Sequence, residues 1–166
     1  VQILEPLAAS QPRWAAAQRE LGLALGDAGR GDEAVAALRA AVRLQPGIAD
    51  AWRALGDHLF AMGDSEAADQ AYANHVRNST RDPRLLEPAL ALAEGRIAVA
   101  EPLLRKHLQQ FPTDVAAIRM LAEIASRIGR YADAENLLAR CLELAPSFNA
   151  ARHNYAVVLH RNNKPV

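Results

Sequence analysis

Three residues that can bind metals or act as nucleophiles recur at one position of a regular spacing. His75, His107 and Cys141 lie 32 and 34 residues apart, and histidine nitrogens and cysteine sulfurs are ligands that Zn²⁺ prefers. Equivalent side chains on neighbouring packed helices start ~8–10 Å apart, whereas zinc ligands lie ~2.0–2.3 Å from the ion. We therefore expect no metal site. Each side chain should instead fill a gap between helices and bond to nearby backbone or glutamate, and Cys141 should behave as a small buried apolar group.

No other pattern supports catalysis or cofactor binding. The glycine-rich run 26–31 lacks the preceding strand and the Gly-Lys-Ser/Thr ending of a phosphate-binding loop, so it predicts a turn between helices. The sequence contains no His-Glu-x-x-His, Cys-x-x-Cys or Gly-x-Ser-x-Gly motif, and its single cysteine excludes an internal disulfide. We therefore expect this chain alone not to be an enzyme, with no catalytic residue, metal or cofactor.

The composition favours helices. The 166 residues include 36 Ala and 22 Leu, while aromatic residues make up only 5%. Alanine and leucine are strong helix formers, and strands favour the β-branched and aromatic residues that are scarce here. The 19 basic and 19 acidic residues cancel, which argues against a nucleic-acid partner. No apolar run approaches the ~18–20 residues that span a bilayer, so we expect no membrane partner and a cytoplasmic location.

Three markers recur at intervals of 34, 32 and 34 residues. Glycines are followed five positions later by alanines, and prolines keep the same rhythm except at Thr80. The glycines are predicted to end the first of two amphipathic helices per period in a left-handed conformation. The alanines should let the second helix approach the first closely, and neighbouring pairs must stack to bury their apolar faces. The markers are Gly29, Gly63, Gly95 and Gly129; Ala34, Ala68, Ala100 and Ala134; and Pro12, Pro46, Pro112 and Pro146.

Within this rhythm, one run of residues resembles the signature of the tetratricopeptide repeat (TPR) family. The resemblance implies an all-α fold, a right-handed α-solenoid of stacked antiparallel helix pairs. It also implies that aromatic residues of the signature pack in the core rather than stack on nucleic-acid bases. The residues that carry it are Trp52, Leu55, Gly56, Leu59, Ala68 and Tyr72.

The repeats that follow from these markers form a single array over residues 1–166. One of them is irregular: Asp82 and Pro83 predict a helix start, and Pro88 predicts a bend or a shortened helix near residues 86–89. Because the chain begins and ends inside repeats, we expect a fragment of a longer protein; its Arg and Ala content is typical of GC-rich bacterial genomes. The predicted units are half-repeats 1–14 and 149–166 and repeats 15–48, 49–80, 81–114 and 115–148.

The TPR resemblance also implies a concave groove lined by the first helix of each pair. Counting the groove positions of the family along each repeat gives the partner-binding residues. The same count adds Leu23, Asp27, Asp50, Asp82, Leu92, Ser126, Val157, His160 and Arg161. The side chains at the fifth position of each repeat form a row that is mostly cationic. The predicted partner-binding residues are Arg19, Arg53, Asp57, Phe60, Leu85, Arg119, Glu123, Arg127 and His153.

Two interpretations of the arginines in this row stay open. They can pair bidentately with carboxylates or phosphates of a ligand, or with acidic residues one turn away on the same helix, such as Asp57 and Glu123. The ninth positions lack the asparagine of the clamp with which some TPR proteins hold a chaperone C-terminus. The groove therefore suits a mixed-charge extended segment or helix better than a free C-terminus.

Taken together, these features predict a protein-interaction scaffold that binds a peptide or protein partner in its groove. An alternative comes from residues 124–166, which resemble the repeat region that precedes the catalytic domain of some bacterial sulfotransferases. This second resemblance implies an accessory region of a larger enzyme whose catalytic domain lies outside this chain. Self-association through apolar faces at the ends of the repeat array is a third interpretation.

Overall fold

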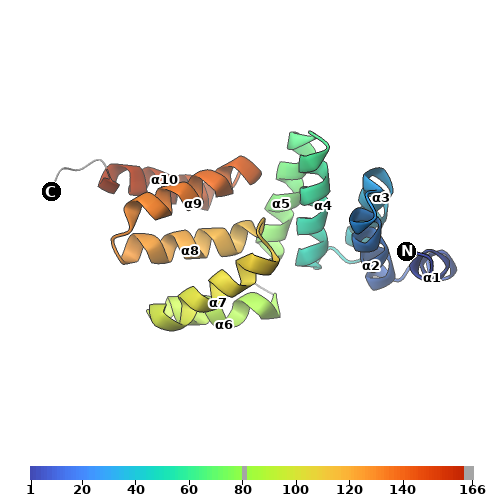
Figure 1. The fold of residues 1–166 in the computed structure, drawn as a ribbon, viewed down its shortest axis with the longest axis horizontal. Helices are drawn as coiled ribbons and strands as arrows, with labels where there is room; N and C mark the ends of the chain where they lie inside the picture. The colour runs from blue at the N-terminus through green and yellow to red at the C-terminus, as the bar shows by residue number, and fades with distance from the viewer. Residues whose placement is uncertain (80–81, 163–166) are drawn as a thin grey trace. The chain divides into compact units, whose positions relative to one another are not determined.

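The computed structural model describes residues 1–79 and 82–162, and within them the chain forms ten α-helices and no strand. It divides into two compact units, Val1–Asn78 (unit 1) and Ser79–Val166 (unit 2). This all-α architecture of helix pairs confirms the predicted fold class. None of the described helices is both long and apolar enough to span a bilayer. The helices are α1 (Leu4–Ser10), α2 (Ala15–Asp27), α3 (Gly31–Leu44), α4 (Ala49–Ala61), α5 (Ser65–Ser79), α6 (Pro83–Ala93), α7 (Ile97–Gln110), α8 (Val115–Arg127), α9 (Tyr131–Leu144) and α10 (Asn149–Asn162) (Figure 1).

Short turns with a left-handed glycine join the helices of each pair. Gly29, Gly63, Gly95 and Gly129 have φ angles of 75°, 82°, 74° and 79°, a region in which a side chain would strain the backbone. The predicted role of these glycines is therefore confirmed. The turn at Gly63 also supplies a cap for α5, because Asp64 Oδ1 accepts a hydrogen bond from the Ala67 N–H at 3.2 Å.

The marker alanines allow the close approach that the sequence predicted. Ala34, Ala68, Ala100 and Ala134 are all fully buried at 0% exposure. First helices also contact one another, α2 with α4 in unit 1 and α6 with α8 and α8 with α10 in unit 2. We call the surface that they share within each unit its first-helix face.

The irregular helix α6 follows one prediction and departs from another. Asp82 is its N-cap, as predicted, with Oδ1 accepting from the Arg84 N–H at 2.9 Å. The helix does not end near residues 86–89, because α6 is α-helical from Pro83 to Ala93. Its 11 residues are nevertheless fewer than the 13 of α2, α4 and α8. The proline removes only one backbone hydrogen bond, and its ring is buried in the core of unit 2.

The Asp82 cap predicts a pH dependence of stability. Burial disfavours the ionised carboxylate, but hydrogen bonds from the side chain and backbone of Arg84 outweigh this effect and lower the pKa of Asp82. The ionised cap therefore stabilises the folded chain fully above the unfolded pKa of about 3.9, and this contribution is lost as the pH falls through the lower folded-state pKa.

Asp82→Asn keeps a good capping side chain and removes the charge. We expect it to lower the free energy of unfolding at pH 7 by about 0.5–1 kcal/mol, since Arg84 is partly exposed. Urea titrations of both proteins from neutral pH down to about pH 3 measure the difference, which should shrink towards zero in acid. A difference that stays constant over this range would contradict the role given to the carboxylate.

Candidate functional site

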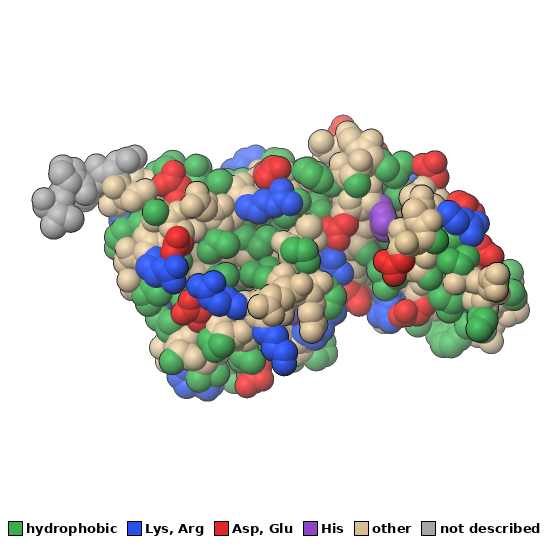
Figure 2. Space-filling view, viewed as in Figure 1, with side chains coloured by type: hydrophobic (Ala, Val, Ile, Leu, Met, Phe, Trp, Pro, Cys, Tyr) green, Lys and Arg blue, Asp and Glu red, His purple; other side chains and the backbone are tan. Residues whose placement is uncertain are grey.

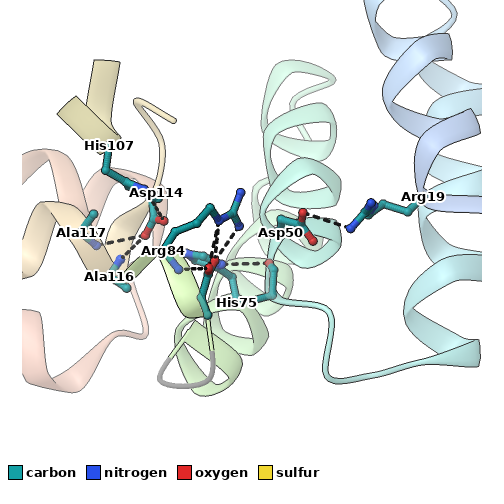
Figure 3. Close-up of polar contacts among 10 residues, drawn as sticks. Arg19, Asp50, His75, Arg84, His107, Asp114, Ala116 and Ala117 are labelled. Atoms are coloured by element: carbon teal, nitrogen blue, oxygen red, sulfur yellow. Dashed lines mark hydrogen bonds and ion pairs between the residues drawn. The ribbon is translucent and has the colours of Figure 1, made fainter. Parts of the chain in front are cut away.

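The two histidines and the cysteine of the recurring position bond separately to neighbouring groups. His75 Nδ1 lies 2.9 Å from the Ala49 carbonyl oxygen, and the Cys141 thiol donates to the Val115 carbonyl at 3.5 Å. These bonds to backbone confirm the packing role predicted for both residues. His107 Nε2 instead lies 2.7 Å from Asp114 Oδ2 (Figure 3). Among the described residues, no group of three or more His, Cys, Asp or Glu side chains is placed to hold a metal ion.

Cys141 lies in an environment that suppresses thiol chemistry. It is fully buried at 0% exposure, and burial raises the pKa of its thiol to about 12. The thiolate is the reactive form of cysteine, so at neutral pH this side chain stays protonated. It packs as a small apolar group.

In unit 1, the arginines of the first-helix face pair with nearby carboxylates. Arg53 Nη1 lies 2.7 Å from Asp57 Oδ2, and the hydroxyl of the buried Tyr72 donates to Asp57 Oδ1 at 2.7 Å. Arg19 pairs with Glu20 and, at 3.4 Å, with Asp50 on α4 (Figure 3). Pairing one turn away on the same helix, one of the two interpretations of the arginine row, is therefore found for Arg53, whereas Arg19 pairs with its neighbour Glu20 and with a second helix. Phe60, which lies on α4, is half-buried.

Leu85 corrects the predicted row of groove residues. It is only 2% exposed and belongs to the core cluster of unit 2, with Leu92 and Leu104. The count had placed it at a fifth position, but α6 begins at Pro83, so Leu85 is the third residue of its helix. The helix nevertheless ends in register with the others: Leu85 stands ten residues before Gly95, as Arg53 does before Gly63. Its burial therefore comes from the neighbours that pack on α6 in unit 2. The fifth residue of α6 is the exposed Glu87.

In unit 2, α8 and α10 form a hollow on the first-helix face. Its volume is about 320 Å³. Four predicted partner-binding residues line it, together with two others that the same count gave; the neighbouring Ala122, Leu138, Ala150, Asn154 and Val158 were missed. The predicted lining residues are Arg119, Glu123, Arg127 and His153, joined by Ser126 and Val157. The missed residues come from α8, α9 and α10 together, and a count along one helix does not contain their arrangement.

Glu123 holds both arginines of this hollow in place. Its Oε2 lies 3.1 Å from Arg119 Nη1, and its Oε1 lies 2.6 Å from Arg127 Nη2. Arg127 Nη1 also donates to the Leu92 carbonyl at 2.9 Å, which accepts the Gly95 N–H at the end of α6 as well. His153 is exposed and makes no hydrogen bond or ion pair within residues 1–79 and 82–162. The hollow therefore combines fixed guanidinium groups, an accessible imidazole and an apolar floor.

The sequence was compared with known protein families and solved structures. Residues 19–83 and residues 91–156 each match a family model described as tetratricopeptide repeat. No curated protein matches the sequence significantly.

Several solved structures are similar to the chain. YrrB, described as a TPR protein with an unusual peptide-binding site, is 16% identical, with 97% of this chain and 84% of that chain covered and a TM-score of 0.46. The Cut9–Hcn1 hetero-tetramer of APC/C gives 19% identity and a TM-score of 0.46, with 97% of this chain and 32% of that chain covered. PilF of Pseudomonas aeruginosa gives 22% identity and a TM-score of 0.44, with 89% and 68% covered.

The match over residues 91–156 lies within unit 2, and the match over residues 19–83 lies mostly within unit 1 and extends five residues into unit 2. Stacked helix pairs, left-handed glycine turns and buried small residues occur in both units. Repeats of this kind serve as scaffolds for protein–protein interaction, which is the general function of this chain. The chain belongs to the tetratricopeptide repeat family.

Proposed function

We propose that the chain binds a mixed-charge, extended peptide or protein segment on its first-helix face, with the hollow between α8 and α10 as the main contact. The observation that carries this proposal is the lining of that hollow, in which Arg119, Glu123, Arg127 and His153 surround apolar side chains. Charged groups around an apolar floor give a partner both orientation and buried area.

The geometry of Arg119 and Arg127 favours binding without rearrangement. Each guanidinium carries five N–H donors, and Glu123 occupies only part of them. Because the ion pairs already restrict both side chains, a partner loses little side-chain entropy when it binds them. A carboxylate of the partner can then accept from the remaining N–H groups and from His153, while an apolar side chain contacts Val157 and Val158.

The predicted partner-binding residues of unit 1 belong to the same proposal, and we expect them to contribute less to binding than the hollow does. Arg53 has only 12% of its side chain exposed and is paired with Asp57, so we give it a positioning role in unit 1. Arg19 and Phe60 remain available for contact at the edges of that pair. Self-association, the exclusion of nucleic acid and the accessory role in a larger sulfotransferase-like enzyme stay predictions.

A double substitution in α10 tests the proposal. Peptides are first selected on the wild-type chain from a displayed library of random short peptides, and their dissociation constants are measured by calorimetry. His153→Glu with Val157→Asp places two carboxylates in the hollow, so we expect the dissociation constants of the selected peptides to rise about tenfold or more, equivalent to the loss of one charge-assisted contact.

The matched control carries the same change of charge on the same helix. Arg152→Gln with Ala156→Asp alters two exposed residues, one turn apart, that do not line the hollow. Peptide binding should stay within about twofold of wild type in this control. Equal losses in both variants, or no loss in the first, would contradict the proposal, provided that both proteins retain the helical circular dichroism spectrum.

A further inference from the structure

A second hollow lies in unit 1, formed by α3, α4 and α5. Its volume is about 290 Å³, and no residue of the proposed partner-binding set lines it. We name it the Trp52 hollow. The lining residues that matter below are Arg39, Arg43, Trp52, Leu55, Leu59 and Ala67.

The charge of the Trp52 hollow is one-sided. Arg39 and Arg43 are its only charged lining residues, and both are exposed. Neither makes a hydrogen bond or ion pair with any residue that the structure describes. The two lie one turn apart on α3, where like charges repel each other. An anionic group bound here would relieve this repulsion.

The floor of the Trp52 hollow is apolar and fixed. The Trp52 Nε1–H donates to the Pro46 carbonyl at 2.8 Å, which satisfies the polar end of the indole and sets its orientation. The tryptophan is half-buried, so part of its indole ring stays accessible in the hollow. Leu55 and Leu59 beside it are buried. The floor therefore offers an aromatic surface of the kind that dominates protein interfaces.

A corresponding hollow in unit 2 shows what the Trp52 hollow lacks. The hollow of unit 2 is lined by Arg105, Leu121 and Asp133, which stand 66 residues after Arg39, Leu55 and Ala67 of the Trp52 hollow.

In unit 2 the cations are neutralised internally. Arg105 Nη2 lies 2.7 Å from Glu101 Oε1, and Arg130 pairs with Asp133. Figure 2 shows side chains of both charges bordering apolar ones over α7, α8 and α9. In unit 1, Val35 and Ala67 stand where unit 2 has Glu101 and Asp133. The Trp52 hollow thus has the arginine and the apolar floor of the corresponding hollow in unit 2 but neither of its two carboxylates.

We propose that the Trp52 hollow binds an acidic peptide segment of a protein partner. An apolar side chain of the segment would lie on Trp52 and Leu55, and flanking carboxylates would pair with Arg39 and Arg43. This surface is separate from the first-helix face, so a partner can occupy either one while the other is blocked. A nucleic acid fits less well, because two arginines over an apolar floor provide no row of cations along a phosphate backbone.

The test uses the full chain, with the hollow between α8 and α10 blocked by His153→Glu and Val157→Asp. A displayed library of random short peptides is selected on this variant, and binding of the enriched peptides is measured by fluorescence anisotropy. We expect enrichment of sequences that combine Asp or Glu with Leu, Ile, Phe or Trp. Adding Arg39→Glu and Arg43→Glu should weaken their binding about tenfold or more.

Ala67→Asp provides a second variant that preserves the fold. It restores the carboxylate that unit 2 has at this position, and an acidic residue in the first turn of α5 is favourable to the helix. We expect it to weaken peptide binding several-fold, because the new carboxylate neutralises the arginines. Lys106→Glu with Arg152→Glu is the matched control, since it changes the net charge as much as the arginine pair does, at exposed positions outside the hollow.

Three results would overturn the proposal. They are a lack of acidic peptides among those enriched, equal binding by the Arg39→Glu/Arg43→Glu protein, and an equal loss in the Lys106→Glu/Arg152→Glu control. Competition by single-stranded DNA that equals competition by the selected peptide would assign the surface to a nucleic acid instead. Because selection is done with the hollow between α8 and α10 blocked, its outcome does not depend on binding in that hollow.

Discussion

Replacing Asp114 with alanine is expected to lower the free energy of unfolding of unit 2 by about 3 kcal/mol. Asp114 is 1% exposed and caps α8, with Oδ1 accepting from the N–H groups of Ala116 and Ala117 at 3.1 and 3.0 Å. Its other oxygen lies 2.7 Å from His107 Nε2 (Figure 3). The loss of an N-cap costs about 1 kcal/mol, and a buried histidine left without a partner costs about 1–3 kcal/mol more.

Asp114→Asn separates these contributions. Asparagine caps helices about as well as aspartate, so this variant should lose only about 1 kcal/mol, chiefly from the bond to His107. Chemical denaturation followed by circular dichroism measures both differences. Equal losses in the alanine and asparagine variants would contradict the capping role, and losses below about 0.5 kcal/mol in both would show that the buried network contributes little.

Replacing Gly56 with alanine should destabilise unit 1 by about 2 kcal/mol, although alanine is the better helix former. A methyl group at this position would lie 2.8–3.0 Å from ring atoms of Tyr72. This ring is fully buried, and its hydroxyl is held by Asp57 at 2.7 Å. Because the ring has nowhere to move, the clash must shift the two helices apart, which outweighs the propensity gain of about 1 kcal/mol.

Gly26 supplies the matched control for this prediction. A methyl group there would lie 2.3 Å from His58 Nε2, an even shorter distance. The His58 ring, however, is half-buried and makes no hydrogen bond within the described part of the chain, so it can rotate away. We expect Gly26→Ala to leave stability unchanged or raise it by up to about 1 kcal/mol. Thermal unfolding of both variants compares them, and a larger loss for Gly26→Ala would refute the explanation.

The regular parts of the fold could be predicted from the sequence because single residues determine them. A glycine such as Gly63 is favoured where φ is positive, and the small side chain of an alanine such as Ala68, which is fully buried, lets two helices approach closely. Pairs one turn apart on a helix, such as Arg53 with Asp57 and Arg119 with Glu123, could also be anticipated, since helix geometry brings them together.

Features that depend on more than one element could not be predicted. The burial of Leu85 depends on the side chains that pack against α6 in the core of unit 2, which a count along one helix does not contain. The bond between His107 and Asp114 joins two helices across a turn. The Trp52 hollow depends on three helices at once. Its arginines make no ion pair within the described residues, whereas Arg105 and Arg130 of unit 2 are paired.

Binding on the first-helix face of unit 2 is the central claim, and a hydrogen–deuterium exchange footprint tests it most directly. A peptide selected on the wild-type chain is added in excess, and exchange is compared with that of the free protein. We predict slower exchange in α8 and α10, in the segments that contain Glu123 and His153, and no such change with the His153→Glu/Val157→Asp variant. A bound peptide that leaves exchange in α8 and α10 unchanged would contradict the claim.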